Sequence, residues 1–430
     1  MKIVNPAILL TILYSLMTIP QDAFACTLFC ASMNGEVLAA GNEDWSDPFS
    51  KMWVSERTVD RYGIINLGHS DFQVQTAINE YGLYFDFAAI PKAEGRNQAG
   101  KEKCSSSLFS EILAKCKNLE EAILYLKKYQ YESSYNQVLM ADALGNSLIV
   151  NRDTIFQSQK AYQIATNFNS CDLVTSNYDC RRYEILDESL ISADQISIPL
   201  FRKLLSNTHQ EGDYPTQYSY IFDLKKGVIY LYSFHNYENV IVLNVKEELD
   251  KGYSMKNFKE LFPQSYEEEY FRNNHRELLT HQLIDKIRKD GADVGLKIYK
   301  DAVHDDPEVA SYPFVLLSTA GGLVHHTWFE DQGGMVFDYW FNPHNVLQWK
   351  SVNKDKVRDI LKIYDYLEST IPKENPKQFI GTYELKGLLY YLLDEKEKSK
   401  DYFQKTIDVA PPETSNYQRA KFFLEEYFEK

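Results

Sequence analysis

Apolar and polar residues alternate along the chain from residue 26 to about residue 90. The segments TLFCASM and EVLAAGNEDW read as strands, separated by Asn34-Gly35, a dipeptide that favours a tight hairpin turn. Two longer segments, WVSERTVDRYGIINLG and VQTAINEYGLYFDFAAI, are again strand-like with glycines at their turns. The pattern predicts an N-terminal region built from β-hairpins.

The spacing becomes helical over residues 105–129, where apolar residues fall on common faces. Strands return in NQVLMADALGNSLIVN and AYQIATNF, residues 181–206 favour a helix, and YSYIFDLKKGVIYLYSF with VIVLNV forms a last hairpin. This order of elements predicts one layered α+β domain over residues 26–247.

The second half of the chain divides into three predicted parts. Residues 248–300 are charged and predict a helical linker. Residues 301–354 predict a small β-rich module, with turns at Gly321-Gly322 and Gly333-Gly334. His325-His326 then fall on opposite faces of a strand, which makes them poor ligands for a single metal ion. Residues 355–430 predict a helical tail.

The tail resembles one tetratricopeptide repeat in the spacing of its small and aromatic residues: Tyr383, Gly387, Tyr390, Ser399, Phe403 and Pro411. Such residues let two antiparallel helices pack closely. A single repeat buries its own faces poorly. Two interpretations follow: a helical hairpin docked on the rest of the chain, or a surface that binds a protein partner.

The first 25 residues read as a signal peptide. Lys2 precedes an apolar run over residues 6–19, and Ala23-Phe24-Ala25 matches an A-x-A cleavage site. Cleavage between Ala25 and Cys26 predicts an exported protein. Alternatives are a short membrane anchor or a lipoprotein, although lipoprotein signals usually carry Leu and a small residue where Ala23 and Phe24 stand here. No later run approaches the roughly 18 apolar residues of a membrane span.

Composition narrows the set of partners. The chain has 430 residues, a formal net charge of −15 and 44% hydrophobic residues. A strongly acidic chain is repelled by nucleic acids and anionic membranes, so neither is expected as a partner. Of six cysteines, Cys171–Cys180 and Cys104–Cys116 are close enough in sequence to pair, but spacing leaves the connectivity open. The sequence contains no P-loop, G-x-G-x-x-G, H-E-x-x-H, G-x-S-x-G or C-x-x-C motif, and no cofactor is predicted.

A cysteine at a new N-terminus carries its own base. Its α-amino group has an ordinary pKa of about 7.7–8.0 and is partly neutral at physiological pH. The amine can therefore activate the thiol of Cys26 for attack on an amide carbonyl. The hairpin brings Asp44 towards Cys26, where a carboxylate could orient the amine. The alternatives are a buried structural cysteine and a solvated acidic turn.

A series of short motifs over residues 26 to about 245 resembles the linear-amide C–N hydrolases, which include bile salt hydrolases, penicillin V acylases and related acyltransferases. The motifs occur in the family's order: Cys26-Thr27, Asn42-Glu43-Asp44-Trp45, Asn79-Glu80-Tyr81-Gly82-Leu83, Ala141 to Asn146, Ala165-Thr166-Asn167-Phe168, Cys180-Arg181-Arg182-Tyr183, and Ser219 to Leu231. The resemblance implies a four-layer αββα N-terminal-nucleophile sandwich and a small acyl-amide as substrate.

The same resemblance assigns roles to four residues. Cys26 is the nucleophile, Asp44 contacts its amine and thiol, and Asn167 donates to the oxyanion, a kind of contact that typically lowers a barrier by roughly 3 kcal/mol. Arg182 steadies the nucleophile's surroundings, with Arg181 as the alternative.

The sequence also departs from the family pattern. Gly41 stands where many relatives have Arg, and Phe87-Ala88-Ala89 offers no polar side chain for the oxyanion, so a backbone N–H would have to serve. These departures argue against bile salts or penicillins as substrates. They leave open a non-catalytic binding protein on the same scaffold, and an acyltransferase using the same thioester.

Overall fold

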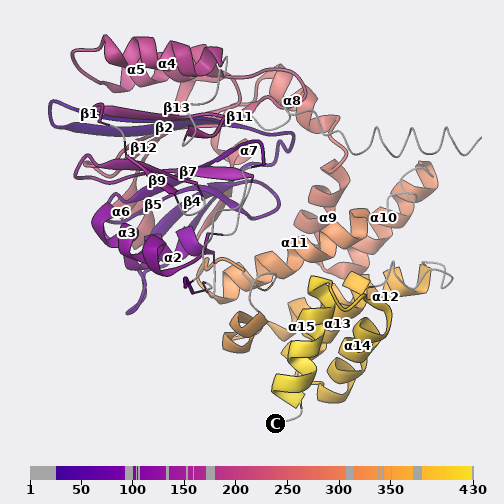
Figure 1. Ribbon diagram of the computed structural model, residues 1–430. Coiled ribbons are helices and arrows are strands. Elements are labelled where there is room, and N and C mark those ends of the chain that lie inside the picture. The colour runs from indigo at the N-terminus through magenta and orange to yellow at the C-terminus, as the bar shows by residue number, and fades with distance from the viewer. Residues whose placement is uncertain are drawn as a thin grey trace, which may run out of the picture.

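The computed structural model describes residues 26–92, 100–102, 104, 107–131, 135–151, 154–157, 159–170, 180–306, 314–337, 339, 343–349, 351–370 and 380–428. The predicted signal peptide and Cys171 lie outside these residues. The described part of the chain has a mixed α and β structure, with two antiparallel sheets beside a group of helices (Figure 1).

The first sheet, sheet A, contains the strand that follows Cys26. Its strands in spatial order are β10 (Tyr162–Ala165), β1 (Thr27–Met33), β2 (Glu36–Asp44), β11 (Thr216–Asp223), β12 (Val228–Ser233) and β13 (Asn236–Asn244). The predicted turn at Asn34-Gly35 is confirmed. Both residues have positive φ, 51° and 83°, as a two-residue hairpin loop requires.

The second sheet, sheet B, faces sheet A. Its strands in spatial order are β14 (Met255–Asn257), β3 (Lys51–Ser55), β4 (Ile64–Gly68), β5 (Val74–Asn79), β6 (Tyr84–Ala89), β7 (Asn136–Ala141), β8 (Ser147–Asn151) and β9 (Thr154–Phe156). Strand β14 lies inside the segment predicted as a helical linker. The sheet therefore continues past residue 247, because Met255–Asn257 add to the edge of β3.

Period-two alternation divides the side chains of β1 between two cores. Leu28 and Cys30 point into the core between the sheets, whereas Phe29 and Ala31 point outwards. The outward side of sheet A is covered by α4 (Arg181–Ile191) and α5 (Ile198–Thr208). The outward side of sheet B is covered by α2 (Leu108–Lys115) and α3 (Leu119–Lys128), as Figure 1 shows.

Two motif residues of the sequence hold these layers together. The Asn79 amide donates to the carbonyls of Leu113 and Cys116, 2.8 Å each, at the end of α2. Asp142 accepts from the backbone N–H of Leu119 at the start of α3 and closes its own turn by accepting from Leu144. Both residues fix a helix to sheet B.

Three of the remaining helices belong to the sheet region. Helices α6 (Val245–Asp250) and α7 (Phe258–Leu261) contribute to the core between the sheets, and α8 (Tyr266–Asn273) accepts a hydrogen bond from Ser233 of β12 through Glu268. The other helices form a lobe beside the sheets (Figure 1): α9 (Leu278–Asp290), α10 (Ala292–Asp305), α11 (Phe314–Asp331), a 3-10 turn (Pro343–Gln348), α12 (Lys354–Thr370), α13 (Ile380–Leu392), α14 (Lys396–Val409), α15 (Ser415–Phe422) and a π turn (Phe423–Phe428). One continuous core joins this lobe to Trp53 and Phe72 of the sheet B region.

The small β-rich module predicted over residues 301–354 is wrong. The described residues there include no strand, and Phe314–Asp331 form α11. Gly321-Gly322 lie inside this helix instead of at a turn. A Cβ on Gly322 would lie 2.6 Å from Ile284 Cδ1, so the glycine permits close packing of α11 on α9. His325 and His326 are therefore helical neighbours, and both are buried.

The predicted helical hairpin of the tail corresponds to α13 and α14. Gly387 packs against the ring of Phe403, and Ser399 donates to the Gly387 carbonyl at 2.8 Å. Leu388, Phe403 and Leu361 belong to the same core as α9 and α11, so the hairpin packs against the rest of the chain. Its resemblance to a tetratricopeptide repeat stays a prediction.

Candidate active site

Cys26 lies directly before β1, beside the end of β2. Thr27 pairs with Asn42, a register that places Cys26 opposite Glu43. The Cys26 thiol accordingly donates to Glu43 Oε2 at 3.5 Å. The hairpin thus brings a carboxylate to the thiol as expected, but that carboxylate belongs to Glu43 and not to Asp44.

Arg182, in the first turn of α4, connects the predicted site residues. Its Nη1 donates to Thr27 Oγ1 at 2.7 Å and to the Cys26 carbonyl at 3.3 Å, and lies 3.5 Å from Asp44 Oδ2. Its Nη2 donates to Asn167 Oδ1 at 2.8 Å. Arg181, the alternative, has an exposed side chain. The geometry therefore selects Arg182 and brings Cys26, Asp44, Asn167 and Arg182 together.

Asp44 is buried and has several donors. Thr216 Oγ1 donates to Oδ1 at 2.5 Å, and Gln210 Nε2 donates to Oδ2 at 2.7 Å. Burial raises the pKa of Asp44 to about 8, while Arg182, Thr216 and Gln210 act in the opposite direction by stabilising the charged form. The desolvation of this carboxyl group thus outweighs the three contacts that stabilise its charge.

A pair of carboxyl groups, Glu43 and Asp86, lies beside the thiol. Burial raises the pKa of Glu43 to about 7, and burial followed by the charge of Glu43 raises the pKa of Asp86 well above its ordinary value. Two carboxyl groups in contact share a proton more readily than they carry two charges. Burial, followed by the charges of Glu43 and Asp44, also raises the pKa of the Cys26 thiol well above its ordinary value.

Tyr220 explains the departure at Gly41. Its hydroxyl donates to Asp86 and lies 2.6 Å from the hydroxyl of Tyr84. A Cβ on residue 41 would lie 2.5 Å from Tyr220 Oη. Position 41 can therefore carry a side chain only if Tyr220 moves. In this chain, the phenol ring of Tyr220 occupies the space that a side chain at position 41 would need.

A cleft with a volume of about 440 Å³ opens onto the thiol. Cys26, Glu43 and Asp44 line it, together with the apolar and aromatic side chains of Trp45, Phe87, Ala89, Ile90 and Tyr135. Asn167 and Arg182 are not among the lining residues. Asn167 Nδ2 reaches the wall by donating to the Ala89 carbonyl at 2.9 Å. The site therefore combines a thiol, carboxyl groups and an apolar wall.

A second cavity of about 400 Å³ lies next to the cleft, and Trp45 and Asp71 line both. Its other walls include Thr280 and His281 of α9, and Gly322 and His325 of α11. The helical lobe thus provides part of the surface beside the candidate active site.

Sequence reasoning missed Glu43, Asp86 and Gln210 as parts of the site. The strand register was the available signal for Glu43, since pairing Thr27 with Asn42 places the next residues opposite each other. Asp86 and Gln210 meet the site only through tertiary packing, and no local pattern marks them.

The cysteine pairing Cys104–Cys116 is not formed, because Cys116 has a free thiol. The other candidate pair includes Cys171, which lies outside the described residues. Among the helices that the structure describes, none combines the length and the apolar character that crossing a bilayer demands.

Comparison with known proteins gives matches at the level of solved structures. Two variants of the conjugated bile acid hydrolase from Clostridium perfringens match at 16% identity with a TM-score of 0.43, covering 54% of this chain and 96% of theirs. Penicillin V acylase from Agrobacterium tumefaciens matches at 16% identity and a TM-score of 0.43, covering 54% of this chain and 90% of its own. No protein-family model and no curated protein matches the chain.

Proposed function

We propose that this chain is an exported cysteine amidohydrolase that cleaves the linear amide bond of an N-acylated small molecule. The observation that carries the proposal is the convergence of Cys26, Asp44 and Asn167 on Arg182 beside a cleft that apolar and polar side chains line together. The resemblance of the ordered motifs to the linear-amide C–N hydrolases supports the same assignment.

Maturation creates the catalytic group in this proposal. Cleavage after Ala25 frees the α-amine of Cys26, which takes the proton of the thiol. Burial of the thiol, followed by the charges of Glu43, Asp44 and Asp86, raises the pKa of Cys26 in the uncleaved chain, so its thiol stays protonated there. A positive ammonium group beside these carboxyl groups would offset that effect.

The reaction has two steps. The Cys26 sulfur attacks the amide carbonyl, the C–N bond breaks, and the amine leaves with the proton that the α-amine held. Water then attacks the thioester, which yields the carboxylic acid and restores the thiol. The sum is one amide and one water giving one acid and one amine, and no cofactor enters this balance.

The other site residues have supporting roles. Asp44 orients the α-amine. Asn167 Nδ2 carries two protons, of which the bond to Ala89 uses one, so the second can serve the oxyanion. Arg182 holds Asn167 and Asp44 in place. The apolar side of the cleft suits an acyl chain, and the adjoining cavity gives room for the rest of the substrate.

The test begins with the intact mass of the exported protein. A mass that starts at Cys26 with a free amine supports the proposal, and a lipid on Cys26 or a retained leader contradicts it. The mature protein is then assayed on a panel of N-acyl amides. We expect Cys26→Ala to abolish hydrolysis and Cys30→Ala, which replaces a buried cysteine on β1, to keep it.

Cys30 is a suitable control because burial raises its pKa to about 12, so it is unreactive at neutral pH. Equal activity of Cys26→Ala and the parent would remove the proposal. A mixture of hydrolysis and transfer products in the presence of a free amine would identify acyl transfer from the same thioester.

A further inference from the structure

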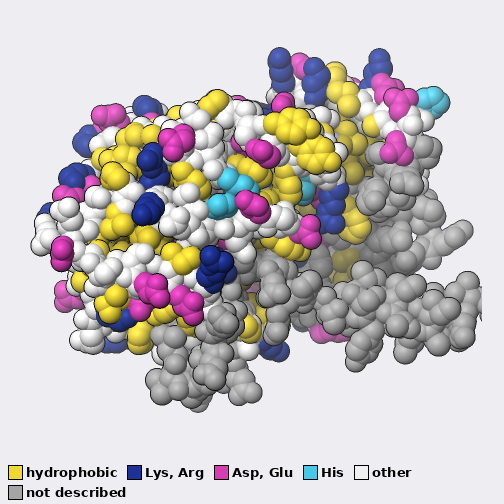
Figure 2. All heavy atoms as spheres, turned by 90° about the horizontal axis from the view of Figure 1, so that it is seen from above, with side chains coloured by type: hydrophobic (Ala, Val, Ile, Leu, Met, Phe, Trp, Pro, Cys, Tyr) yellow, Lys and Arg dark blue, Asp and Glu magenta, His cyan; other side chains and the backbone are white. Residues whose placement is uncertain are grey.

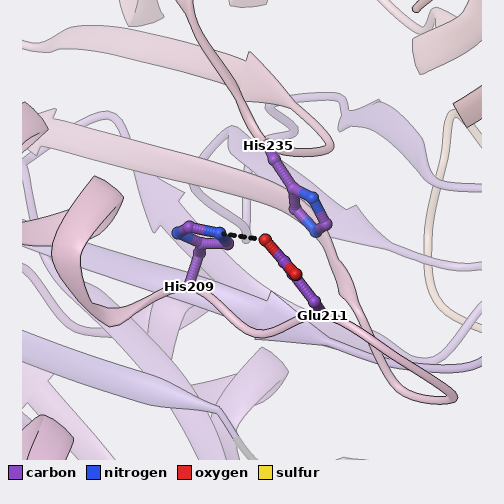
Figure 3. Close-up of side chains that lie close together, drawn as sticks. All are labelled: His209, Glu211 and His235. Carbon is purple, nitrogen blue, oxygen red and sulfur yellow. Dashed lines mark hydrogen bonds and ion pairs between the residues drawn. The ribbon is translucent and has the colours of Figure 1, made fainter. Parts of the chain in front are cut away.

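Three side chains that can bind a metal ion meet on the loop after α5. His209 is the C-terminal cap of α5, Glu211 lies two residues later, and His235 lies in the turn between β12 and β13. One ligand atom of each lies within 4.8 Å of the others. Figure 3 shows the three side chains converging, with the Glu211 carboxylate between the two rings.

The tautomer of His209 is fixed by its surroundings. His209 Nδ1 lies 2.6 Å from the Ser206 carbonyl, which can only accept a hydrogen bond, so Nδ1 carries the proton in the neutral ring. Nε2 then presents its lone pair to Glu211 Oε1 at 3.4 Å. Two acceptors that face each other are stabilised by a cation between them, and a carbonyl bond of this kind orients metal-binding histidines generally.

His235 brings a second nitrogen to the same place. Its Nε2 is buried and has no hydrogen-bond partner among the described residues. Phe234 stacks on the ring at 4.2 Å, and the ring of His209 lies 4.8 Å away. The backbone N–H of Phe234 donates to the Gln217 carbonyl at 2.8 Å, which fixes the turn. A buried polar atom without a partner is unfavourable, and a metal ion would remove that penalty.

We propose that His209, Glu211 and His235 bind a divalent transition-metal ion of the zinc type, with a fourth position open to water. Two imidazole nitrogens and a carboxylate suit zinc better than calcium or magnesium, which prefer oxygen ligands. Ligands at about 2.0–2.1 Å from a tetrahedral zinc ion lie roughly 3.3 Å apart. The pair His209 and Glu211 already has this spacing.

The ion can reach the site from solvent. The Glu211 side chain is 78% exposed, and that of His209 is 25% exposed. On the face seen in Figure 2, histidine side chains reach the surface beside acidic ones. A small rotation of the exposed Glu211 side chain would complete the ligand set.

The proposed site adjoins Asp44 through one residue. Gln210 stands between the ligands His209 and Glu211, and its side chain donates to Asp44 Oδ2 at 2.7 Å. Its backbone N–H and carbonyl both bond to Thr216, the other donor to Asp44. The residues on either side of Gln210 would bind the metal ion, so the ion would fix this loop. The proposed role of the ion is structural, because the Cys26 thiol is not one of its ligands.

The test is a calorimetric titration of the tag-free full chain with Zn²⁺. A Cys26→Ala background removes the reactive thiol as a ligand. We expect one Zn²⁺ per chain, with binding at least about 10-fold weaker after His235→Ala, because even second-shell changes weaken metal sites about 10–100-fold. His304→Ala, which removes an exposed histidine on α10, should bind like the background.

Thermal unfolding provides the second measurement. Zn²⁺ should raise the melting temperature of the background protein and leave that of His235→Ala unchanged. If His235→Ala does not fold, Glu211→Gln replaces it, because that side chain is exposed. Absence of Zn²⁺ binding in the background, or equal binding in the ligand variants, would overturn the proposal.

Discussion

The guanidinium of Arg182 contacts each of the other three predicted site residues. It donates to the Cys26 carbonyl and to Asn167, and forms an ion pair with Asp44. A planar group with five donors can hold these partners at once, whereas a lysine ammonium cannot. Arg182 is thus a positioning residue whose substitution should disturb the whole site.

We expect Arg182→Lys to lower kcat/KM for the best amide substrate by about 10-fold or more, a loss of at least roughly 1.4 kcal/mol of transition-state stabilisation. Steady-state kinetics on the mature protein checks this. Arg181→Lys, at the exposed neighbouring position, should stay close to the parent. Equal losses in both variants would contradict the role of Arg182.

The Glu43 carboxyl group raises the pKa of the Cys26 thiol by its charge, after the larger effect of burial. Replacing Glu43 with Gln removes the charge while keeping the shape. We expect Glu43→Gln to speed alkylation of Cys26 by iodoacetamide several-fold at pH 8, measured by mass spectrometry in the uncleaved chain. An unchanged rate would show that the charge of Glu43 does not control the reactivity of the thiol.

For single residues, the sequence predicted which side chains come together better than it predicted which atoms are in contact. Cys26, Asp44, Asn167 and Arg182 were identified from motif order, and the structure places them together, while their catalytic roles remain predictions. The thiol donates to the carboxyl group of Glu43, the neighbour of Asp44, because the register of the hairpin sets Glu43 opposite Cys26. Asp86 and Gln210 required the tertiary structure.

Among the secondary-structure elements, the hairpins and the amphipathic helices in the first half of the chain could be predicted from the hydrophobic periodicity and from the turn residues. The β-rich module was wrongly predicted, because the glycine pair of α11 predicts a turn by its composition alone. Glycine inside a helix also serves close packing, as at Gly322 against Ile284 and Gly387 against Phe403. Local sequence does not distinguish these two uses.

Two glycines of α13 provide a matched pair for this interpretation. A Cβ on Gly387 would lie 2.9 Å from Phe403, whose ring stacks on Phe423 at 4.6 Å, whereas a Cβ on Gly381 would meet nothing within 4 Å. We expect Gly387→Ala to lower the free energy of unfolding by about 1–3 kcal/mol. Gly381→Ala should raise it by up to about 1 kcal/mol, since alanine favours helices.

Urea unfolding of the two variants measures both values. A higher free energy of unfolding for Gly387→Ala would show that the ring of Phe403 can shift to make room for the added methyl group. It would also weaken the view that this glycine sets the spacing of α13 and α14.

For the whole molecule, the buried acids predict a pH dependence of stability. Burial raises the pKa of Glu43 from the ordinary 4.5 to about 7. A carboxyl group with a raised pKa favours the folded state below its unfolded pKa, and this contribution is lost as the pH rises through the folded pKa. The chain should therefore lose stability between about pH 4.5 and pH 7 on account of this group.

Glu43→Gln should flatten this decline between pH 5 and pH 8. The difference between the folded pKa of about 7 and the ordinary pKa of 4.5 corresponds to a change of at most about 3 kcal/mol in the free energy of unfolding. Denaturant unfolding of parent and variant at both pH values gives the comparison. A parallel decline in the two proteins would assign the effect to other groups.

The helical lobe is part of the same folded unit as the sheets. It covers Trp53 and Phe72, and β14 completes the edge of sheet B after residue 247. We expect a fragment of residues 26–247 to lose several kcal/mol of stability, since each buried aromatic side chain contributes roughly 1.5–3 kcal/mol. Thermal unfolding and light scattering check this, and a fragment as stable as the full chain would refute it.

The order of strands in sheet A has a consequence for the timing of the proposed maturation. Both neighbours of the β1–β2 hairpin, β10 and β11, come from more than a hundred residues further along the chain. During synthesis the N-terminus of the chain emerges first, so Cys26 is exposed long before those strands have been made. We therefore expect the bond before Cys26 to be open to a processing peptidase early, and the nucleophile to be enclosed only when the last hairpin has arrived.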